Sequence, residues 1–417
     1  MHFAASAAVY YESLAKQAPD VLARIKQLDK EGRWNVVGGW WLEPDVNMPS
    51  GESLVRQGLY GQRTFIKMFG HPAHVAWIPD TFGYPWSLPQ IFLKSGLDFF
   101  VTQKLRWNDT DKWPARLNQF YWEGPDGSKI FSYIPYGYDS DLDPQTLATQ
   151  ERTTIDSSAV PRMLTLYGVG DHGGGPTMEM LERSHDLERI PAFPVMRDDS
   201  PTDALTRMRT DFPADGPVVR DELYLEYHRG VFTTQSEMKR WNRHMEGLLG
   251  AAEAAATVSP APYPHRALTD AWHTTLFNQF HDLAAGSGID SIYMDATVQY
   301  REANAMADGA LATSLRALAA PLDTRPLRTG DVPMLAFNPS GVARTDVVEC
   351  APPAGGDSAG AAAAWTAYDA EGRALPTEPG DSGRIKIRVG PVPAVGSTVF
   401  FLRPSKPVPA TTVPGWT

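Results

Sequence analysis

The chain has 417 residues, of which 42% are apolar and 21% charged, which is typical of folded globular proteins and excludes disordered and fibrous classes. Its formal net charge of -11 argues against a nucleic-acid-binding surface, which needs clustered Lys and Arg. Cys350 is the only cysteine, so no intrachain disulfide can form and we expect a cytoplasmic location.

The N-terminal segment resembles neither a signal peptide nor a membrane anchor. Residues 1–20 lack a basic start followed by a long apolar run, and no stretch of 18 apolar residues occurs anywhere in the chain. Residues 4–28 are expected to be helical on both sides of a break at Pro19. We therefore expect no contact with a membrane.

Up to about residue 220, helical segments alternate with short apolar runs, which predicts an α/β domain with a parallel sheet or barrel. The length of the chain favours two or three domains. The expected strands of this first domain are 34–38, 73–78, 99–102, 129–134 and 163–169.

Residues 221–322 have a helical pattern. Apolar side chains repeat at steps of mostly three and four residues from Met238 to Ala252, and further helices are expected at 267–280 and 291–319. This pattern predicts a helical bundle.

From 333 to 417 the pattern becomes that of a β domain, interrupted by the low-complexity segment 352–364, which we expect to be a mobile loop. The expected strands are 334–337, 346–349, 384–389 and 398–402, which are few for a complete sandwich.

The most informative motif is WIPDTFGYPWSLPQI at 77–91, in which an apolar strand ends at Asp80. A carboxylate at the end of a strand lies where α/β barrels place catalytic groups. A carboxylate in this position can equally cap the following helix, and the motif alone does not separate the two roles.

Two further motifs carry groups suited to catalysis or metal binding. In NQFHDLAAGSGI (278–289), His281 and Asp282 are expected to close a helix, where they would suit a metal or a sugar hydroxyl, although a structural helix end is the commoner role. In YGVGDHGGGPT (167–177), a strand is expected to end at Asp171 before three glycines that let the backbone approach a ligand. No phosphate-binding GK[ST] follows.

Paired aromatic and charged residues occur in two other segments. Trp40 and Trp41 precede Glu43 and Asp45, an arrangement that suits sugar stacking and hydroxyl recognition, although buried Trp is more common. Tyr227, His228 and Arg229 cluster just before the helical region, where ligand contact and a structural ion pair are equally open.

Taken in order, the segments GGWWLEPD, GESLVRQ, WIPDTFGY, YGVGDHGGGPT, EYHRGVFTTQ and NQFHDLAAGS resemble glycoside hydrolase family 38, the α-mannosidases, particularly the bacterial members. The resemblance covers about residues 3–350. It implies a seven-stranded α/β barrel catalytic domain (1–220), a three-helix bundle (221–322) and the start of a β-sandwich domain (333–417).

The resemblance also implies a chemistry, namely a retaining α-mannosidase that removes terminal α-mannosyl residues from oligosaccharides through a covalent intermediate. Asp80 would be the nucleophile and a Zn²⁺ ligand, His281 a second Zn²⁺ ligand, and Asp171 the candidate acid/base. Substrate contacts would come from Asp282, Trp40, Trp41, Asp45, His228 and Arg229. A homo-oligomer is possible.

The chain departs from the family pattern at its start. The family takes two further zinc ligands from a His-x-Asp motif on its first barrel strand, and no such motif occurs here; His2 is followed by Phe3 and Ala4. We therefore expect a chain that is incomplete at both ends, lacks the first barrel strand and binds zinc weakly. The alternatives are a non-catalytic carbohydrate-binding remnant and a metal-dependent polysaccharide deacetylase, although the HxxxH spacing of deacetylases is absent.

Overall fold

The computed structural model describes residues 1–109, 117–170, 174–191, 193–322, 328–351 and 365–404. These residues form two compact units, Met1–Glu246 with His273–Tyr300, and Gly247–Trp272 with Arg301–Thr417. The expected mobile loop at 352–364 lies outside the described residues. Within the described ranges, no helix combines the length and the apolar character needed to cross a membrane.

The strands of the first unit form two sheets. β1 (Phe3–Ala5) and β2 (Trp34–Val36) are parallel, and the Gly38 N–H bonds to the Val75 carbonyl oxygen at 2.8 Å, which ties this pair to the start of the larger sheet. The larger sheet has the order β3 (Val75–Trp77), β4 (Phe99–Val101), β6 (Lys129–Tyr133), β5 (Gln119–Glu123) and β7 (Val218–Val219). Among the described strand pairs of this sheet, β5 with β6 is antiparallel and the other three are parallel.

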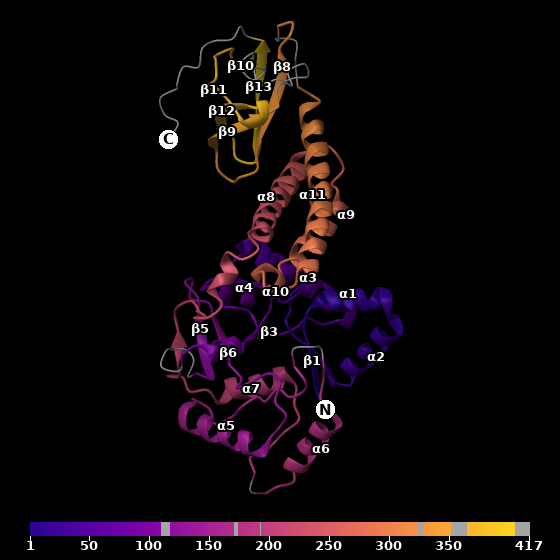
Figure 1. Ribbon diagram of the computed structural model, residues 1–417, viewed down its shortest axis with the longest axis vertical. Coiled ribbons are helices and arrows are strands. Elements are labelled where there is room, and N and C mark those ends of the chain that lie inside the picture. Colours follow the sequence, from indigo (N-terminus) through magenta and orange to yellow (C-terminus); the bar gives the residue numbers. More distant parts are fainter. Residues whose placement is uncertain (110–116, 171–173, 192, 323–327, 352–364, 405–417) are drawn as a thin grey trace. The chain divides into compact units, whose positions relative to one another are not determined.

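Helices surround these strands. α1 and α2 lie beside β1 and β2 (Figure 1), and the break between them at Ala18 confirms the interruption expected at Pro19. Side chains cap several N-termini; Ser50 Oγ, for example, accepts from the Ser53 N–H at the start of α3. The helices are α1 (Ala8–Gln17), α2 (Pro19–Lys30), α3 (Gly51–Phe69), α4 (Leu88–Lys94), α5 (Pro144–Ser157), α6 (Met178–Leu187) and α7 (Pro201–Asp211), with short 3₁₀ helices η1 (Lys104–Trp107) and η2 (Arg229–Phe232).

Four of the five strands expected in this unit are confirmed. The fifth prediction, at 163–169, is wrong, because this apolar run makes only an isolated bridge between Tyr167 and Ser140. The helix expected from residue 4 is also wrong at its start, where Phe3–Ala5 is a strand. The mixed α/β class is thus confirmed, whereas a closed seven-stranded barrel stays a prediction.

The helical pattern after residue 221 is confirmed. α8 (Ser236–Val258), α9 (His265–Phe277) and α11 (Asp290–Ala319) are the long helices, and parts of each belong to both units. The apolar stripe of α8 is buried at Met238, Met245, Leu249 and Ala252. A short helix, α10 (His281–Ala285), begins at His281, so the prediction that this histidine closes a helix is wrong.

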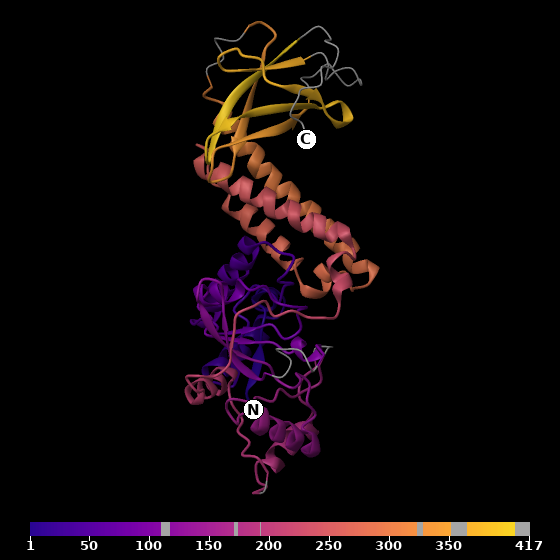
Figure 2. The same ribbon diagram turned by 90° about the vertical axis from the view of Figure 1, so that its left-hand side faces the viewer.

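The β region of the second unit consists of two three-stranded antiparallel sheets, β10-β13-β8 and β11-β12-β9, drawn in orange and yellow in Figure 2. Side chains of both sheets, among them Phe400 and Ile387, share one apolar core. The strands are β8 (Val332–Asn338), β9 (Arg344–Cys350), β10 (Trp365–Asp369), β11 (Thr377–Pro379), β12 (Ile385–Val392) and β13 (Gly396–Pro404). All four expected strands occur, together with β10 and β11.

Candidate active site

Asp80 lies just beyond the carboxyl end of β3. The neighbouring strand β4 is parallel to it, and Trp77 pairs with Val101. Asp80 and Lys104 each follow this pair by three residues, and the Lys104 N–H bonds to the Pro79 carbonyl oxygen at 3.0 Å. Because carboxyl ends of parallel strands meet at one edge, the two side chains converge there.

His281 reaches the same place from the start of α10. The Asp45 N–H bonds to the Gln279 carbonyl at 2.8 Å, which pairs the segment around Glu43 with the one that leads into α10. The Glu43 carbonyl lies 2.9 Å from His281 Nδ1 and 3.2 Å from the His281 N–H. Only 4% of His281 is exposed. Its Nδ1 is therefore occupied by a backbone partner, and Nε2 faces the carboxylates.

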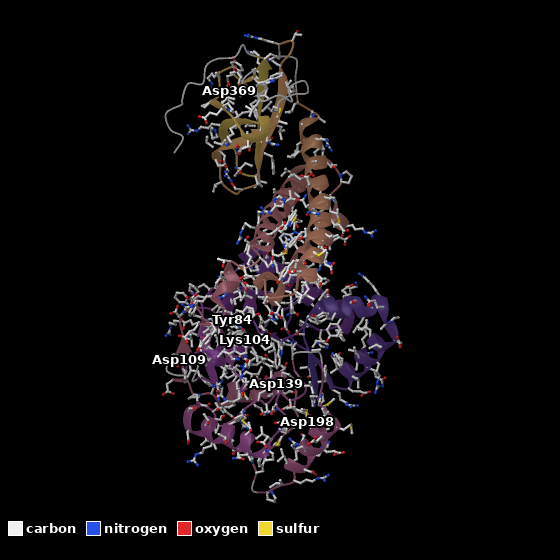
Figure 3. The ribbon with its side chains drawn as sticks, viewed as in Figure 1. Tyr84, Lys104, Asp109, Asp139, Asp198 and Asp369 are labelled. Atoms are coloured by element: carbon white, nitrogen blue, oxygen red, sulfur yellow. The ribbon has the colours of Figure 1, made fainter. Side chains whose placement is uncertain are left out.

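Asp80, His281 and Asp282 form a compact group. His281 Nε2 lies 3.4 Å from Asp80 Oδ2 and 3.9 Å from Asp282 Oδ2, and one possible ligand atom from each of the three residues lies within 4.8 Å of the others. The second oxygen of Asp80, Oδ1, accepts from Lys104 Nζ at 2.5 Å and from the Tyr138 hydroxyl at 3.4 Å. Figure 3 labels Lys104 and Tyr84; the Tyr84 hydroxyl lies 2.9 Å from the Ile78 carbonyl oxygen.

The electrostatics of this group keep Asp80 ionised. Burial works against the charge, but hydrogen bonds from His281 and Lys104 lower the pKa of Asp80 to about 2. Burial would also lower the pKa of His281, yet the bond to Asp80 and the charge of Glu43 raise it. Burial raises the pKa of Glu43, whose carboxylate accepts a bond from Ser6. The result is an ionised carboxylate next to the His281 imidazole, whose pKa is raised.

A cavity of the first unit has a volume of about 640 Å³ and is lined by residues of β1 and of the segments 161–167 and 193–199. Asp80 and His281 are not among its lining residues, but Tyr138 and Trp77 are. Because the Tyr138 hydroxyl bonds to Asp80, the cavity adjoins the charged group without containing it.

The group has the composition of a zinc site. Zinc takes imidazole nitrogen and carboxylate oxygen ligands, and its histidine ligands are usually fixed by a bond from the second ring nitrogen to a carbonyl or carboxylate. His281 meets this description, since the Glu43 carbonyl holds Nδ1. The donors of Asp80, His281 and Asp282 therefore fit a metal ion such as zinc.

Comparison with known proteins decides the family. The model of the glycosyl hydrolases family 38 N-terminal domain matches residues 1–229, which is more than half of the chain, and the α-mannosidase middle domain matches residues 226–318. The chain belongs to glycoside hydrolase family 38.

Individual relatives agree with this membership. Alpha-mannosidase 2C1 of Mus musculus is 34% identical over 367 residues, covering 85% of this chain and 34% of the relative. An alpha-mannosidase of Saccharomyces cerevisiae is 35% identical over 346 residues, covering 73% of this chain and 31% of the relative. The chain thus spans about a third of the length of these curated family 38 proteins.

A solved structure extends the likeness to the fold. The alpha-mannosidase from Enterococcus faecalis V583 aligns with a TM-score of 0.74 at 19% identity, over 98% of this chain and 50% of that chain. At this identity the match concerns the fold alone. It agrees with the mixed α/β fold of the first unit and the helices that follow.

The expected sugar platform at Trp40 and Trp41 is corrected by the structure. Their exposed fractions are 2% and 4%; Trp40 belongs to the hydrophobic core, and Trp41 stacks on His273 at a centroid distance of 4.1 Å. Neither ring offers a face to a ligand. Asp45 is also fully buried, and its Oδ1 accepts from the Asn47 and Met48 N–H groups at 2.8 Å.

The remaining predicted residues lie at the surface or outside the described residues. His228 is exposed, and its ring packs edge-on against that of Phe82, at a centroid distance of 5.0 Å. The Arg229 guanidinium lies over the Tyr224 ring at 5.7 Å. Asp171, the acid/base candidate, lies outside the described residues.

At this family 38 site, Lys104 was not identified from the sequence as functional, and Glu43 was expected only to recognise sugar hydroxyls. Lys104 holds Asp80, and Glu43 positions His281 through its backbone carbonyl. The equal spacing of Asp80 and Lys104 from the ends of two adjacent strands is the signal that could have found Lys104. No local signal links Glu43 to His281, because they are 238 positions apart.

Proposed function

We propose that this chain carries the catalytic group of a retaining α-mannosidase that hydrolyses terminal α-mannosyl residues of oligosaccharides. The observation that carries this proposal is the ionised Asp80 held between His281 and Lys104, in a chain of family 38. The curated relatives compared above carry the name alpha-mannosidase, which supports the choice of sugar.

In the proposed reaction Asp80 is the nucleophile. An oxygen of its carboxylate donates an electron pair to the anomeric carbon, the bond to the aglycone oxygen breaks, and that oxygen takes a proton from the acid. Water then adds to the same carbon from the face that the aglycone left, its proton returns to the acid, and Asp80 is released. The low pKa of Asp80 suits this role, since only the ionised form attacks.

Asp171 is the proposed acid/base, and contacts of its neighbours support it. The Tyr138 hydroxyl bonds to Asp80, and the next residue, Asp139, packs so closely on Gly170 that a Cβ there would lie 2.8 Å from its Cβ. These contacts connect Asp80, through Tyr138 and Asp139, to Gly170, the residue before Asp171. A retaining reaction needs a separation of about 5 Å between the two carboxyl groups.

We further propose that zinc is the cofactor and that Asp80 Oδ2, His281 Nε2 and Asp282 hold it. A bound zinc ion would supply Lewis-acid stabilisation and would hold sugar hydroxyls. Asp282 is about half exposed and thus accessible to a sugar. The first-unit sheets would correspond to part of the barrel expected for the family.

The test is hydrolysis of 4-nitrophenyl α-mannoside by the whole chain supplied with zinc. Asp80→Asn should lower kcat/KM by roughly a thousandfold, because the amide cannot act as the nucleophile. The matched control is Asp98→Asn, which removes an exposed carboxylate that also pairs with a histidine, His74, at 2.8 Å. That variant should keep about the wild-type rate.

A covalent adduct gives an independent readout. A fluorinated mannosyl fluoride that forms a long-lived intermediate should add its mass to the peptide that contains Asp80. An adduct on another carboxylate would refute the assignment of Asp80. Heat on mixing with mannose but no turnover would instead support the carbohydrate-binding remnant.

A further inference from the structure

Lys104 is a buried cation with a single carboxylate partner among its described contacts. Its residue is 4% exposed, and its ammonium bonds to Asp80 Oδ1 at 2.5 Å. The same ammonium lies 3.7 Å from the centroid of the Trp107 ring and 5.4 Å from that of Phe82. Lysine is rarely buried without a partner because removing its charge from water is costly. The position of this ammonium is therefore well defined.

The backbone fixes Lys104 as firmly as its side chain does. The N–H groups of Gln103 and Lys104 both bond to the Pro79 carbonyl oxygen at 3.0 Å, one residue before Asp80. The lysine and the carboxylate thus belong to two loops that are joined directly. Movement of one relative to the other would break these bonds.

The two oxygens of Asp80 consequently have different neighbours. Oδ1 faces Lys104 and the Tyr138 hydroxyl, whereas Oδ2 faces His281 Nε2 at 3.4 Å. A metal ion held with His281 and Asp282 would lie on the Oδ2 side. A carboxylate that is free on both sides can bind a metal through both oxygens. Here Lys104 already occupies Oδ1.

We infer that Lys104 is a positioning residue that restricts Asp80 to a one-oxygen contact with the metal through Oδ2 and reserves Oδ1 for the sugar carbon. This inference rests on the proposed function. The ammonium also places a positive charge beside a ligand of a dication, so it opposes metal binding while it orients the nucleophile. In a variant without this charge, metal binding should become tighter, whereas the reaction should become slower because the nucleophile is no longer oriented.

The experiment compares Lys104→Met with the wild-type chain by calorimetric titration of Zn²⁺ into the chelator-treated protein. Methionine keeps most of the stem that packs on Trp107 and removes the charge. We expect zinc to bind at least about tenfold more tightly, because Asp80 can then use both oxygens and the repulsion is gone. With 4-nitrophenyl α-mannoside, kcat should fall at least about tenfold with little change in KM.

Two controls accompany it. Lys129→Met removes the same charge from an exposed lysine paired with Glu123 at 3.2 Å, and zinc affinity should stay within about threefold of the wild type. Lys104→Arg keeps the charge and should not tighten zinc binding. Far-ultraviolet circular dichroism of each variant checks that it is folded.

If Lys104 had only a structural role, Lys104→Met would instead weaken zinc binding, because a looser loop would disturb the metal site. A folded Lys104→Met variant with unchanged or weaker zinc binding would therefore overturn the inference, as would undetectable binding in both proteins. If zinc binding tightens but no protein hydrolyses the mannoside, the restriction of Asp80 stands and the proposed activity fails.

Discussion

The charge group around Asp80 should stabilise the fold, although catalytic groups often destabilise their proteins. Asp80→Asn in the zinc-free protein tests this directly, because asparagine has the same shape and lacks the charge. The carboxylate bonds to Lys104 and lies beside His281, whose pKa is raised. Glu43 is the opposing carboxylate, since the charge of Asp80 contributes to its raised pKa.

The magnitude follows from the pKa. Asp80 has a pKa of about 2, compared with 3.8 for an unperturbed carboxyl. Each pKa unit corresponds to about 1.4 kcal/mol, so the ionised form gains at most about 2.5 kcal/mol. The side chain is 26% exposed, and water screens part of the interaction. We therefore expect Asp80→Asn to lower the free energy of unfolding by about 1–2 kcal/mol at pH 6.

The pH dependence has a definite sign. A carboxyl whose folded pKa is lowered stabilises the fold above its unfolded value, and this contribution is lost as the pH falls from 3.8 to about 2. The raised pKa of His281 acts in the other direction, since its contribution is present below 6.5 and is lost as the pH rises through the folded value. The difference between variant and wild type should be greatest near pH 5–6.

Urea unfolding followed by tryptophan fluorescence is a suitable assay. Nine of the twelve Trp residues lie within residues 1–246, so the signal reports mainly on the first unit. Asp98→Asn is the control, because its exposed pair with His74 should contribute less than about 1 kcal/mol. An Asp80→Asn protein that is as stable as the wild type at pH 6, or more stable, would refute the reasoning and show that carboxylate repulsion dominates.

Two further predictions concern the metal and the helix packing. Zinc binding at pH 6 should release a proton from His281, whose pKa is raised, and calorimetry in buffers of different ionisation enthalpy should measure the release; His281→Gln should lose both the release and at least about tenfold in affinity. Gly61→Ala should cost at least about 2 kcal/mol in urea unfolding because its Cβ would lie 2.3 Å from the Trp40 carbonyl carbon. Gly247→Ala has no atom within 4 Å of its Cβ and should instead stabilise α8 by up to about 1 kcal/mol; a destabilised Gly247→Ala or a neutral Gly61→Ala would contradict the packing.

The long helices could be predicted because their apolar stripes repeat over many residues. Not all of the short strands could be predicted. Phe3–Ala5 contains two alanines, which favour a helix locally, but the segment pairs with Trp34–Val36 and tertiary contact decides its conformation. The run 163–169 is apolar enough for a strand, yet only Tyr167 finds a bridging partner. Both errors arise where a sequence of a few residues gives little periodicity to read.

The site residues are likewise far apart in the sequence but close together in the structure. Asp80 and His281 are 281 − 80 = 201 positions apart, and only the family resemblance joined them before their Nε2–Oδ2 distance of 3.4 Å was known. The paired Trp40 and Trp41 looked like a sugar platform because large aromatic rings serve both as binding surfaces and as core. Burial, which the sequence does not display, separates these two roles.

Lys104 can be identified from the register of neighbouring strands but not from a sequence motif. No motif marks it, since a lysine after a short strand is common. Its position becomes informative only when β3 and β4 are known to be parallel neighbours with Trp77 opposite Val101, because equal offsets then place residues 80 and 104 together. A cation at that offset restricts one carboxylate oxygen, and the other oxygen stays available to a metal. The register of two three-residue strands thus determines how the proposed nucleophile can divide its oxygens between metal and sugar.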